Sequence, residues 1–377
     1  MSEMQQEIRK IREIISQGQN FLVMGHRNVD GDAYGSSMAL YFYLKNLGKT
    51  VEIVNEANIT PLFHFLDCHT LVTQSIQGQE FDAIFVCDCG ELELLGKPRE
   101  DAPDIFKNTP LVNIDHHNGN KLFGDYDLVD TGASSTCEIL CNLLENTPLS
   151  NSLLEGESTG DKSDKILPTP LSPGGNYISP LSFGREVGGE GSEEPGGGGG
   201  IITPQIATLL LFGIIRDTNC FKNSIRPRTF EVTSELIALG ADYEKIIFHT
   251  YKSEKLNYLK LYGHVLDTLI SLKGGSIIGG YISQDTFKQY GIPENELGPQ
   301  LINEILSSLD GSDFAFLIKE TEDGNMKLSL RARKNTFNVS KIARHFGGGG
   351  HIFSAGAYTD KTLSEILRVI EEMDVRM

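Results

Sequence analysis

The sequence lacks any apolar run long enough to cross a membrane. No uninterrupted apolar stretch among the 377 residues approaches the roughly 20 residues that a membrane-spanning helix needs. The polar, charged beginning of the chain, residues 2–12, also lacks the basic-then-apolar pattern of a signal peptide. We therefore expect a cytosolic protein that does not act at a membrane.

Cysteine and positive charge are also scarce. The six cysteines include no pair of CxxC motifs of the kind that binds structural zinc, and they form no disulfide framework in a chain of this length. The 33 Lys and Arg are outnumbered by 51 Asp and Glu, so the formal net charge is -18. A broad basic groove for long nucleic acid, including long DNA, is therefore not expected. A small anionic ligand is compatible with this charge where metal ions or a few local cations reverse the field.

The N-terminal part of the chain alternates between apolar strands and amphipathic helices. Strands are predicted at 21–24, 50–55, 83–87 and 109–114, with a helix over 33–47 between the first two. This alternation predicts an α/β domain with a parallel sheet. From residue 276 the pattern changes to strands at 277–282, 314–318 and 327–330 and helices at 300–309 and 339–346. A second, smaller α+β domain fits this pattern.

Composition changes mark the expected domain limits. Residues 155–200 are rich in Gly, Ser, Pro and acids and finish in five consecutive glycines. Such a stretch buries too little apolar area to offset its ordering entropy, so we interpret it as a mobile or disordered insertion. We expect a first domain over 1–241 that contains this insertion, a helical linker over 242–272, and a second domain over 273–377.

Acidic and histidine side chains follow three of the predicted strands, and another acid ends a predicted helix. They are His26, Asp30 and Asp32 after the first strand, Asp88 after 83–87, the triplet Asp115-His116-His117 after 109–114, and Asp217 after the helix at 206–215. Because the carboxyl ends of parallel strands meet at one edge of a sheet, we expect these side chains to lie together. Structural alternatives exist for each, such as a helix cap from Asp32, a strand-end cap from Asp88 or an ion pair between Asp217 and Arg216. Four segments at one edge favour a shared site over four separate explanations.

The residue types narrow the ligand of this site. Carboxylates with imidazole and no thiolate suit Mn²⁺, with Mg²⁺, Co²⁺ or Fe²⁺ as competitors, better than a sulfur-rich zinc site. Two such ions about 3.5–4 Å apart activate a bridging water and neutralise a phosphoryl group. The sequence therefore predicts two divalent metal ions and phosphate chemistry.

The order and spacing of these residues resemble the four successive motifs of the DHH phosphoesterase family. The matching residues are Gly25-His26-x-x-x-Asp30-Gly31-Asp32, Asp88, Asp115-His116-His117 and Asp217-Thr218. The tail resembles the DHHA1 domain that accompanies them, through Ser329-Leu330-Arg331 and Phe346-Gly347-Gly348-Gly349-Gly350-His351. Val29 and Ala332 stand where the family usually has proline and serine. Neither departure removes a metal ligand.

The resemblance implies a role for each residue. One ion would be held by His26, Asp30 and Asp88, and the other by Asp32, Asp88, His116 and Asp217, with Asp88 bridging. Asp115 would orient His116. Asp88 and His117 are the expected catalytic residues, His117 facing the substrate phosphate or the attacking water as a polarising group or an acid. Substrate contacts are expected from Arg331, Gly348, Gly349, Gly350 and His351, in a cleft between the two domains. A helix C-cap and flexible turn is the structural alternative for the glycine run.

Within this family, a DHH domain paired with DHHA1 alone resembles enzymes that act on small nucleotides. We expect first the hydrolysis of cyclic di-AMP and pApA to AMP. The alternative is an oligoribonuclease (nanoRNase) that is also a phosphatase of 3′-phosphoadenosine 5′-phosphate. Inorganic pyrophosphate or polyphosphate hydrolysis is less favoured, because such an enzyme has no need of a nucleoside-binding surface. A non-catalytic nucleotide receptor is also less favoured, because every expected metal ligand is present. Whether the chain forms a homodimer stays open.

Overall fold

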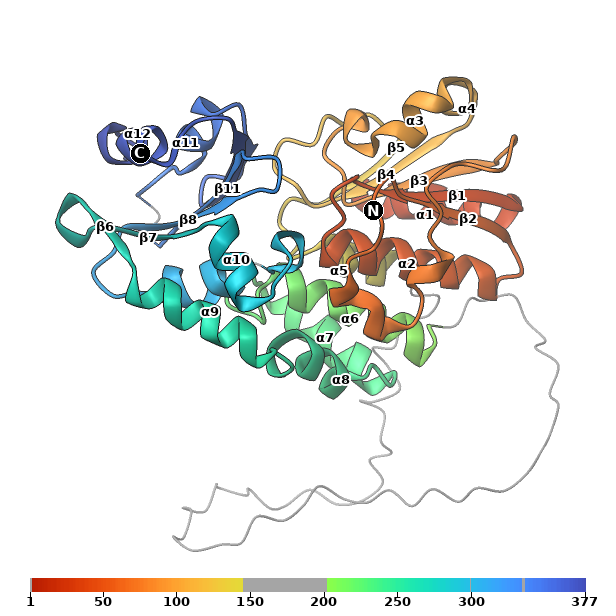
Figure 1. Ribbon diagram of the computed structural model, residues 1–377. Coiled ribbons are helices and arrows are strands. Elements are labelled where there is room, and N and C mark those ends of the chain that lie inside the picture. Colours follow the sequence, from red (N-terminus) through yellow and green to blue (C-terminus); the bar gives the residue numbers. More distant parts are fainter. Residues whose placement is uncertain (1, 145–201, 299, 334–335) are drawn as a thin grey trace, which may run out of the picture. The chain divides into compact units, whose positions relative to one another are not determined.

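The computed structural model describes residues 2–144, 202–298, 300–333 and 336–377 (Figure 1). The chain divides into two compact units. Unit 1 comprises Met1–Ile59 and Leu66–Tyr243, and unit 2 comprises Thr60–Phe65 and Glu244–Met377. The insertion predicted at 155–200 lies outside the described residues.

Unit 1 is built on a parallel sheet, as the sequence predicted. Its strands are β1 (Asn20–Gly25), β2 (Thr50–Val54), β3 (Ala83–Cys87), β4 (Leu111–Asp115) and β5 (Tyr126–Val129). They lie in the order β2-β1-β3-β4-β5, and every neighbouring pair is parallel. All residues of β3 and β4 are buried, because helices cover both faces of a sheet of this kind. The apolar runs in the sequence are the consequence of this two-sided burial.

Helices α2, α5 and α6 lie on one side of this sheet, and α3 and α4 lie on the other (Figure 1). The longer helices of unit 1 are α1 (Glu3–Gln17), α2 (Gly31–Asn46), α5 (Thr136–Leu144), α6 (Pro204–Asp217) and α7 (Pro227–Ala238). The shorter ones are η2 (His69–Leu71), η3 (Leu92–Leu95), α3 (Lys97–Asp101) and α4 (Pro103–Asn108). All but the last residue of η1 (Pro61–Leu66) and all but the first residue of α8 (Tyr243–Ile247) belong to unit 2. Within the described parts of the chain, no helix is both long and apolar enough to cross a bilayer.

Two glycines let α2 and α6 cross at short range. A Cβ atom on Gly35 would lie 2.6 Å from the carbonyl oxygen of Leu209 and 3.1 Å from the amide nitrogen of Gly213. Only glycine fits at so close an approach of two backbones. The crossing holds the start of α2 and the end of α6 in a fixed relation, and both ends carry residues of the predicted site.

Unit 2 contains a six-stranded mixed sheet in the order β10-β11-β9-β8-β7-β6. Its strands are β6 (Ile270–Leu272), β7 (Ile277–Ile282), β8 (Phe314–Glu320), β9 (Met326–Ala332), β10 (Gly349–Gly350) and β11 (Ser354–Thr359). Strands β7 and β8 are parallel, and the other neighbours are antiparallel. This is the α+β domain that the sequence predicted.

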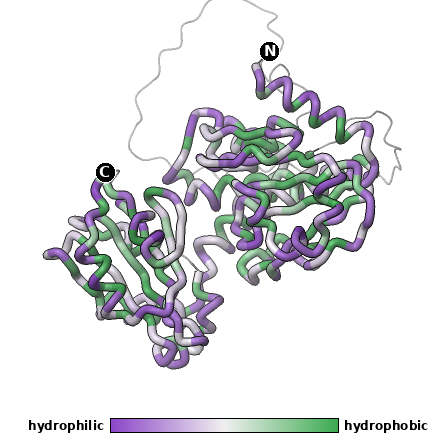
Figure 2. Tube along the Cα trace, turned by 90° about the horizontal axis from the view of Figure 1, so that it is seen from above, coloured by the Kyte–Doolittle hydropathy of each residue, from purple (hydrophilic) through white to green (hydrophobic). Residues whose placement is uncertain are grey.

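Helices and turns pack on both faces of this sheet. They are η4 (Phe248–Lys252), α9 (Leu256–Asp267), η5 (Lys273–Gly275), α10 (Gln284–Tyr290), η6 (Glu294–Glu296), η7 (Leu301–Ile305), η8 (Leu306–Ser308), α11 (Ser340–His345) and α12 (Leu363–Glu372). One face carries a core with side chains from β8, β9, α11 and α12. The other carries a core with side chains from α9, α10, η7 and β8. In Figure 2 many of the hydrophobic, green stretches of the tube lie in the middle of each unit.

Unit 2 differs from the prediction in two places. The predicted helix at 300–309 is instead a π-helical turn, η7, followed by the 3-10 turn η8. Helix α9, in the predicted linker, packs Tyr258, Leu261 and Val265 into the core of unit 2.

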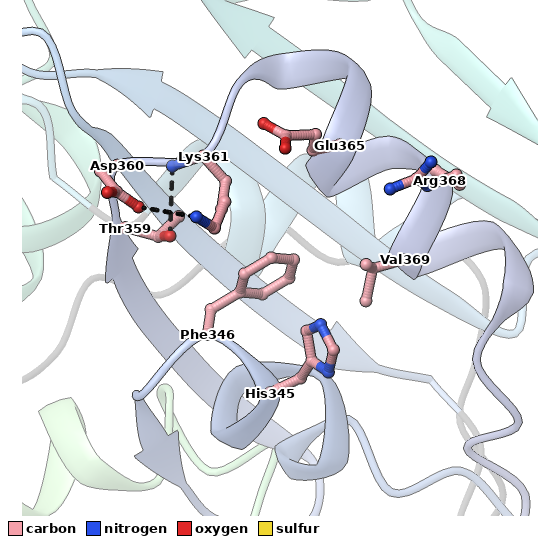
Figure 3. A pocket seen from close by; sticks show the side chains of 8 residues that line it. All are labelled: His345, Phe346, Thr359, Asp360, Lys361, Glu365, Arg368 and Val369. Carbon is pink, nitrogen blue, oxygen red and sulfur yellow. Dashed lines mark hydrogen bonds and ion pairs between the residues drawn. The ribbon is translucent and has the colours of Figure 1, made fainter.

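A cavity of about 350 Å³ opens between α11, α12 and the end of β11 (Figure 3). None of the predicted site residues lines this cavity.

Candidate metal centre

Predicted site residues from four segments of unit 1 come together beyond the carboxyl ends of its strands. His26, Asp30 and Asp32 follow β1, Asp88 follows β3, and the triplet of residues 115–117 is at the end of β4. Asp217 is the last residue of α6. The strand order reverses direction between β1 and β3, and open α/β sheets bind their ligands at such a switch point.

The histidine nitrogens define two overlapping groups of acids. In the first, Nε2 of His26 lies 3.9 Å from Oδ2 of Asp30 and 3.8 Å from Oδ2 of Asp88. In the second, Nε2 of His116 lies 3.8 Å from Oδ2 of Asp32, 3.5 Å from Oδ2 of Asp217 and 3.6 Å from Oδ1 of Asp88. Two sets of three residues each bring their ligand atoms within 4.8 Å of one another. One set is formed by residues 26, 30 and 88, and the other by residues 32, 116 and 217.

Asp88 stands between the two groups. Its Oδ2 faces His26 and its Oδ1 faces His116. Its backbone has φ of 57°, in the left-handed region that aspartate and asparagine tolerate better than most residues. Burial raises the pKa of Asp88 well above that of an ordinary carboxyl, and the charges of neighbouring acids, led by Asp32 and Asp30, raise it further. The side chain is therefore placed where a cation would favour its ionised form.

Asp30 and Asp32 are held by backbone amides. The Oδ1 of Asp30 accepts hydrogen bonds from the amides of Asp32 at 3.0 Å and Ala33 at 3.1 Å, so Asp30 is the N-cap of α2. The structural alternative that assigned this cap to Asp32 was wrong. The two oxygens of Asp32 instead accept from the amides of Thr136 at 2.6 Å and Cys137 at 3.0 Å, at the start of α5.

The partner expected for Asp115 was also wrong. Its Oδ1 lies 2.7 Å from Nδ1 of His117, not against His116. The reason is local geometry, because residues 115 and 117 point to the same side where β4 ends. Burial opposes ionisation of Asp115, but the hydrogen bond and charge of His117 outweigh it and lower the pKa of Asp115. Asn120 completes the arrangement, since its Nδ2 donates to Oδ2 of Asp115 at 2.6 Å.

The donor set fits a hard or borderline divalent cation. Carboxylates and imidazoles form the groups, and no thiolate takes part in them. Burial, followed by the charges of Asp32 and Asp30, also raises the pKa of Asp217 well above its usual range. Among the described residues, no lysine or arginine forms an ion pair with the acids at positions 30, 32, 88 and 217. A bound cation would supply the positive charge that these acids need.

Comparison with known proteins agrees with this geometry. A model of the N-terminal domain of the DHH family matches residues 20–167, and a model of the DHHA1 domain matches residues 284–374. This chain belongs to the DHH/DHHA1 family of phosphoesterases. Unit 1 therefore contains the DHH domain, and unit 2 contains the DHHA1 domain.

Several known proteins are similar to this DHH/DHHA1 chain over most of its length. The bifunctional oligoribonuclease and PAP phosphatase NrnA of Thermus thermophilus is 24% identical over 355 residues, which cover 92% of this chain and 88% of the relative. The cyclic-di-AMP phosphodiesterase GdpP of Geobacillus thermodenitrificans is 24% identical over 385 residues, which cover 96% of this chain but 48% of the relative. An exopolyphosphatase-related protein from Bacteroides fragilis has the same fold, with a TM-score of 0.76 at 19% identity and coverage of 99% and 97% of the two chains.

Polar residues that the sequence did not point to hold two of the predicted ligands in place. Thr136 donates its hydroxyl to Oδ1 of Asp88 at 3.0 Å. Asn55, directly after β2, donates its Nδ2 to the carbonyl oxygen of His26 at 3.0 Å. Both side chains are buried. The position of Asn55 after a strand was the one signal in the sequence that could have identified it.

Gly213 of α6 lies directly against a residue of the DHH site. A Cβ atom at this position would lie 2.2 Å from Sγ of Cys137 and 2.9 Å from Oδ1 of Asp32. Any larger residue would therefore push directly on a predicted metal ligand. The close crossing of α2 and α6 is part of the construction of the site.

In the DHHA1 domain, Arg331 is held by a side chain that the sequence analysis also missed. Its Nε donates to Oδ1 of Asn303, on the π-helical turn η7, at 2.7 Å. Its Nη1 donates to the carbonyl oxygen of Leu330 at 2.9 Å. The guanidinium group thus has a fixed direction, which suits a planar fork that binds phosphate.

The glycine run forms β10 and packs closely on β11. Cβ atoms on Gly348 and Gly350 would lie 2.1 Å from the carbonyl oxygen of Gly356 and 2.6 Å from that of Ser354. At these two positions the absence of a side chain allows the backbone of β11 to approach closely. At Gly349 nothing lies within 4 Å of a Cβ atom, so this position faces open space. His351 follows directly and accepts, through its carbonyl oxygen, a hydrogen bond from the amide of Ser354 at 3.3 Å.

Proposed function

We propose that this chain hydrolyses phosphoester bonds of small nucleotides, and that two divalent ions, most readily Mn²⁺, are its cofactors. The observation that carries the proposal is the position of Asp88, whose two carboxylate oxygens face two different histidines at 3.8 Å and 3.6 Å. One carboxylate directed at two groups is the arrangement that a bridging ligand requires.

The residues divide into two sets of ligands. His26, Asp30 and Asp88 would hold one ion, and Asp32, Asp88, His116 and Asp217 the other. When bound, such ions lower the pKa of water and neutralise the charge of a phosphoryl group. Mg²⁺, Co²⁺ and Fe²⁺ are competitors for the same donors.

His117 has the geometry of a group that acts on the substrate. Asp115 fixes the ring through Nδ1, so the other ring nitrogen, Nε2, is on the side away from this carboxylate. Asn120 and the buried position of Asp115 hold the pair in one orientation. We assign His117 to polarising the phosphate or protonating the leaving oxygen.

Among substrates, we now place 3′-phosphoadenosine 5′-phosphate and oligoribonucleotides of a few residues first. The NrnA relatives from Thermus thermophilus and Bacillus subtilis match over 88% and 87% of their own lengths. The GdpP relative matches over 48% of its length. This difference favours an enzyme of the NrnA kind over the cyclic di-AMP hydrolysis that we expected from the sequence. Cyclic di-AMP and pApA stay as the second candidates.

Other expectations from the sequence stay predictions. They are the cytosolic location, the placement of the substrate between the DHH and DHHA1 domains, and the contacts from Arg331, Gly348, Gly349, Gly350 and His351. A homodimer stays open.

The test is product analysis by chromatography after incubation with Mn²⁺. The purified full-length chain is given, separately, 3′-phosphoadenosine 5′-phosphate, a five-nucleotide RNA, pApA, cyclic di-AMP and pyrophosphate. We expect AMP from the first and mononucleotides from the second, both abolished by EDTA and by Asp88→Asn. Preferred cleavage of cyclic di-AMP would reverse the order of the substrates. Pyrophosphate cleavage alone, or no metal-dependent turnover of any substrate, would refute the proposal.

A further inference from the structure

One face of the DHHA1 sheet is open over β9 and β11. Leu328 and Leu330 of β9 point into the core formed with α11 and α12, so the alternate residues Lys327, Ser329 and Arg331 point to the opposite face. Over β7 and β8 this second face is covered by α9, α10 and η7. Over the far end of β9 it is uncovered, since Lys327 is exposed.

Strand β11 extends this open face. Its register pairs Ser354 with Arg331, Gly356 with Ser329, and Tyr358 with Lys327, so these side chains share the same face. Gly349 of β10 pairs with Gly356 and also carries no side chain over it. Serine and glycine residues therefore make up the middle of this face. Arg331 lies at one end of it, and Lys327 lies beside Tyr358 at the other.

Tyr358 is a fixed aromatic surface at the far end. Its hydroxyl donates to Asp323 and accepts from Nδ2 of Asn325 at 3.1 Å. The residue as a whole is 52% exposed. Anchoring one edge of an exposed ring reduces the entropy lost when a flat group stacks on it.

Lys327 is the cation that could bind an anion at this end. Among the described residues Lys327 forms no ion pair. The nearby acid, Asp323, also accepts from the hydroxyl of Thr321 at 2.6 Å, in addition to Tyr358 and Asn325. These hydrogen bonds stabilise the ionised form of Asp323 and direct its carboxylate to groups of the turn between β8 and β9 and to the hydroxyl of Tyr358. A free cation is notable in a chain with a formal net charge of -18.

The distance between the two ends exceeds one nucleotide. Arg331 and Lys327 are four residues apart on one strand, which is about 13–14 Å at the usual rise of a β-strand. A phosphate bound by Arg331 and a base stacked on Tyr358 therefore belong to different nucleotides. Aromatic rings stack on bases of any sequence, and single strands are bound by such rings beside cations.

We propose that Lys327 and Tyr358 form a second nucleotide subsite, which binds the neighbouring nucleotide of a short single-stranded RNA through its phosphate and base. This inference rests on the proposed function and adds a substrate-length preference to it. A substrate with one nucleoside, such as 3′-phosphoadenosine 5′-phosphate, does not reach this subsite.

The experiment compares two substrates in the full-length chain. The ratio of kcat/KM for a five-residue oligoadenylate to kcat/KM for 3′-phosphoadenosine 5′-phosphate is measured for wild type, Tyr358→Ala, Tyr358→Phe and Lys327→Gln. We expect Tyr358→Ala to lower this ratio by about 5- to 150-fold, the range given by the loss of one base-stacking contact. Tyr358→Phe keeps the ring but loses the hydroxyl that anchors it, so it should lower the ratio less than Tyr358→Ala does. The exposed Lys361, just beyond β11, supplies the control variant Lys361→Gln.

An unchanged ratio in a folded Tyr358→Ala variant that still cleaves RNA would overturn the subsite while leaving the proposed function intact. If Tyr358→Ala does not fold, Lys327→Gln decides by the same ratio. If the wild type hydrolyses neither of these two substrates, the order of substrates in the proposed function is wrong, and the subsite is tested by fluorescence anisotropy with labelled oligoadenylate. Equal affinity of wild type and Tyr358→Ala would then overturn it, and weaker binding by the variant would support it.

Discussion

Replacing Asp88 with asparagine should make the metal-free protein more stable and remove its response to metal. In the protein alone, burial and neighbouring acids raise the pKa of Asp88. The ionised carboxylate therefore opposes folding at any pH above the unfolded pKa, and this penalty grows until the pH passes the raised folded pKa. Asparagine carries no charge, tolerates the left-handed backbone of this position and keeps nearly the same shape. We expect Asp88→Asn in EDTA to melt above wild type in EDTA at neutral pH.

Metal should reverse that order. A ligand present at 100 times its Kd adds about 2.7 kcal/mol of stability to the form that binds it. For a unit of this size that is about 5–11 °C in Tm, at about 2–4 °C for each kcal/mol. Because Asp88 faces both groups, its replacement should remove the whole shift, whereas Asp30→Asn should remove only part of it. Asp30 faces one group, and asparagine is an equally good N-cap for α2.

Differential scanning fluorimetry with a series of Mn²⁺ concentrations measures these shifts. The matched control is Asp285→Asn, an aspartate with a 97% exposed side chain in the first turn of α10, which should behave as wild type. A metal-induced shift in Asp88→Asn as large as in wild type would refute the assignment of Asp88 as a shared ligand. A wild-type Tm that does not respond to Mn²⁺ or EDTA would refute the metal site itself.

Three further substitutions test parts of the same scheme. Gly213→Ala should push α2 and α6 apart at the metal ligands, weaken Mn²⁺ binding at least 10-fold by titration calorimetry and lower Tm; unchanged affinity would show that the crossing does not set the site. Gly348→Ala should lower Tm, because its Cβ meets the backbone of β11. Gly349→Ala should leave Tm within about 1 °C and raise KM for 3′-phosphoadenosine 5′-phosphate. An unchanged KM would show that Gly349 does not contact the substrate. Asn303→Ala should raise KM about 5- to 10-fold, the effect of losing about one hydrogen bond. In an Arg331→Lys background the Nε donor is already absent, so Asn303→Ala should have no further effect on KM. Additive effects of the two substitutions on KM would show that Asn303 does not act through Arg331.

The parallel sheet and the grouping of the acids and histidines were predictable because burial leaves a strong pattern. Strands buried on both faces are continuous apolar runs, and β3 and β4 show such runs in the sequence. Acids and histidines directly after such runs must lie at one edge. His26, Asp88 and His116 therefore follow from the strand positions alone, even though long stretches of chain separate them.

Contacts between distant segments were not predictable in the same way. The hydroxyl of Thr136 reaches Asp88 across 48 positions of sequence, and nothing near Thr136 marks that contact. The pairing of Asp115 with His117 depends on how the backbone turns as β4 ends, a detail that residue types do not determine. The glycines at 348 and 350 illustrate the same limit, because their neighbour is β11, which the sequence analysis did not predict.

The left-handed backbone at Asp88 limits which residues can replace this predicted ligand. Most replacements at this position would both remove the ligand and strain the loop, so a protein that keeps its fold without the metal site has few residues to choose from. Asparagine and glycine are the two that accept this conformation most readily. A relative with either residue here, and with an otherwise complete set of acids and histidines, is therefore a candidate for a receptor that binds nucleotides without cleaving them. The backbone angle at Asp88, φ of 57°, therefore makes Asn and Gly the replacements to look for at this position.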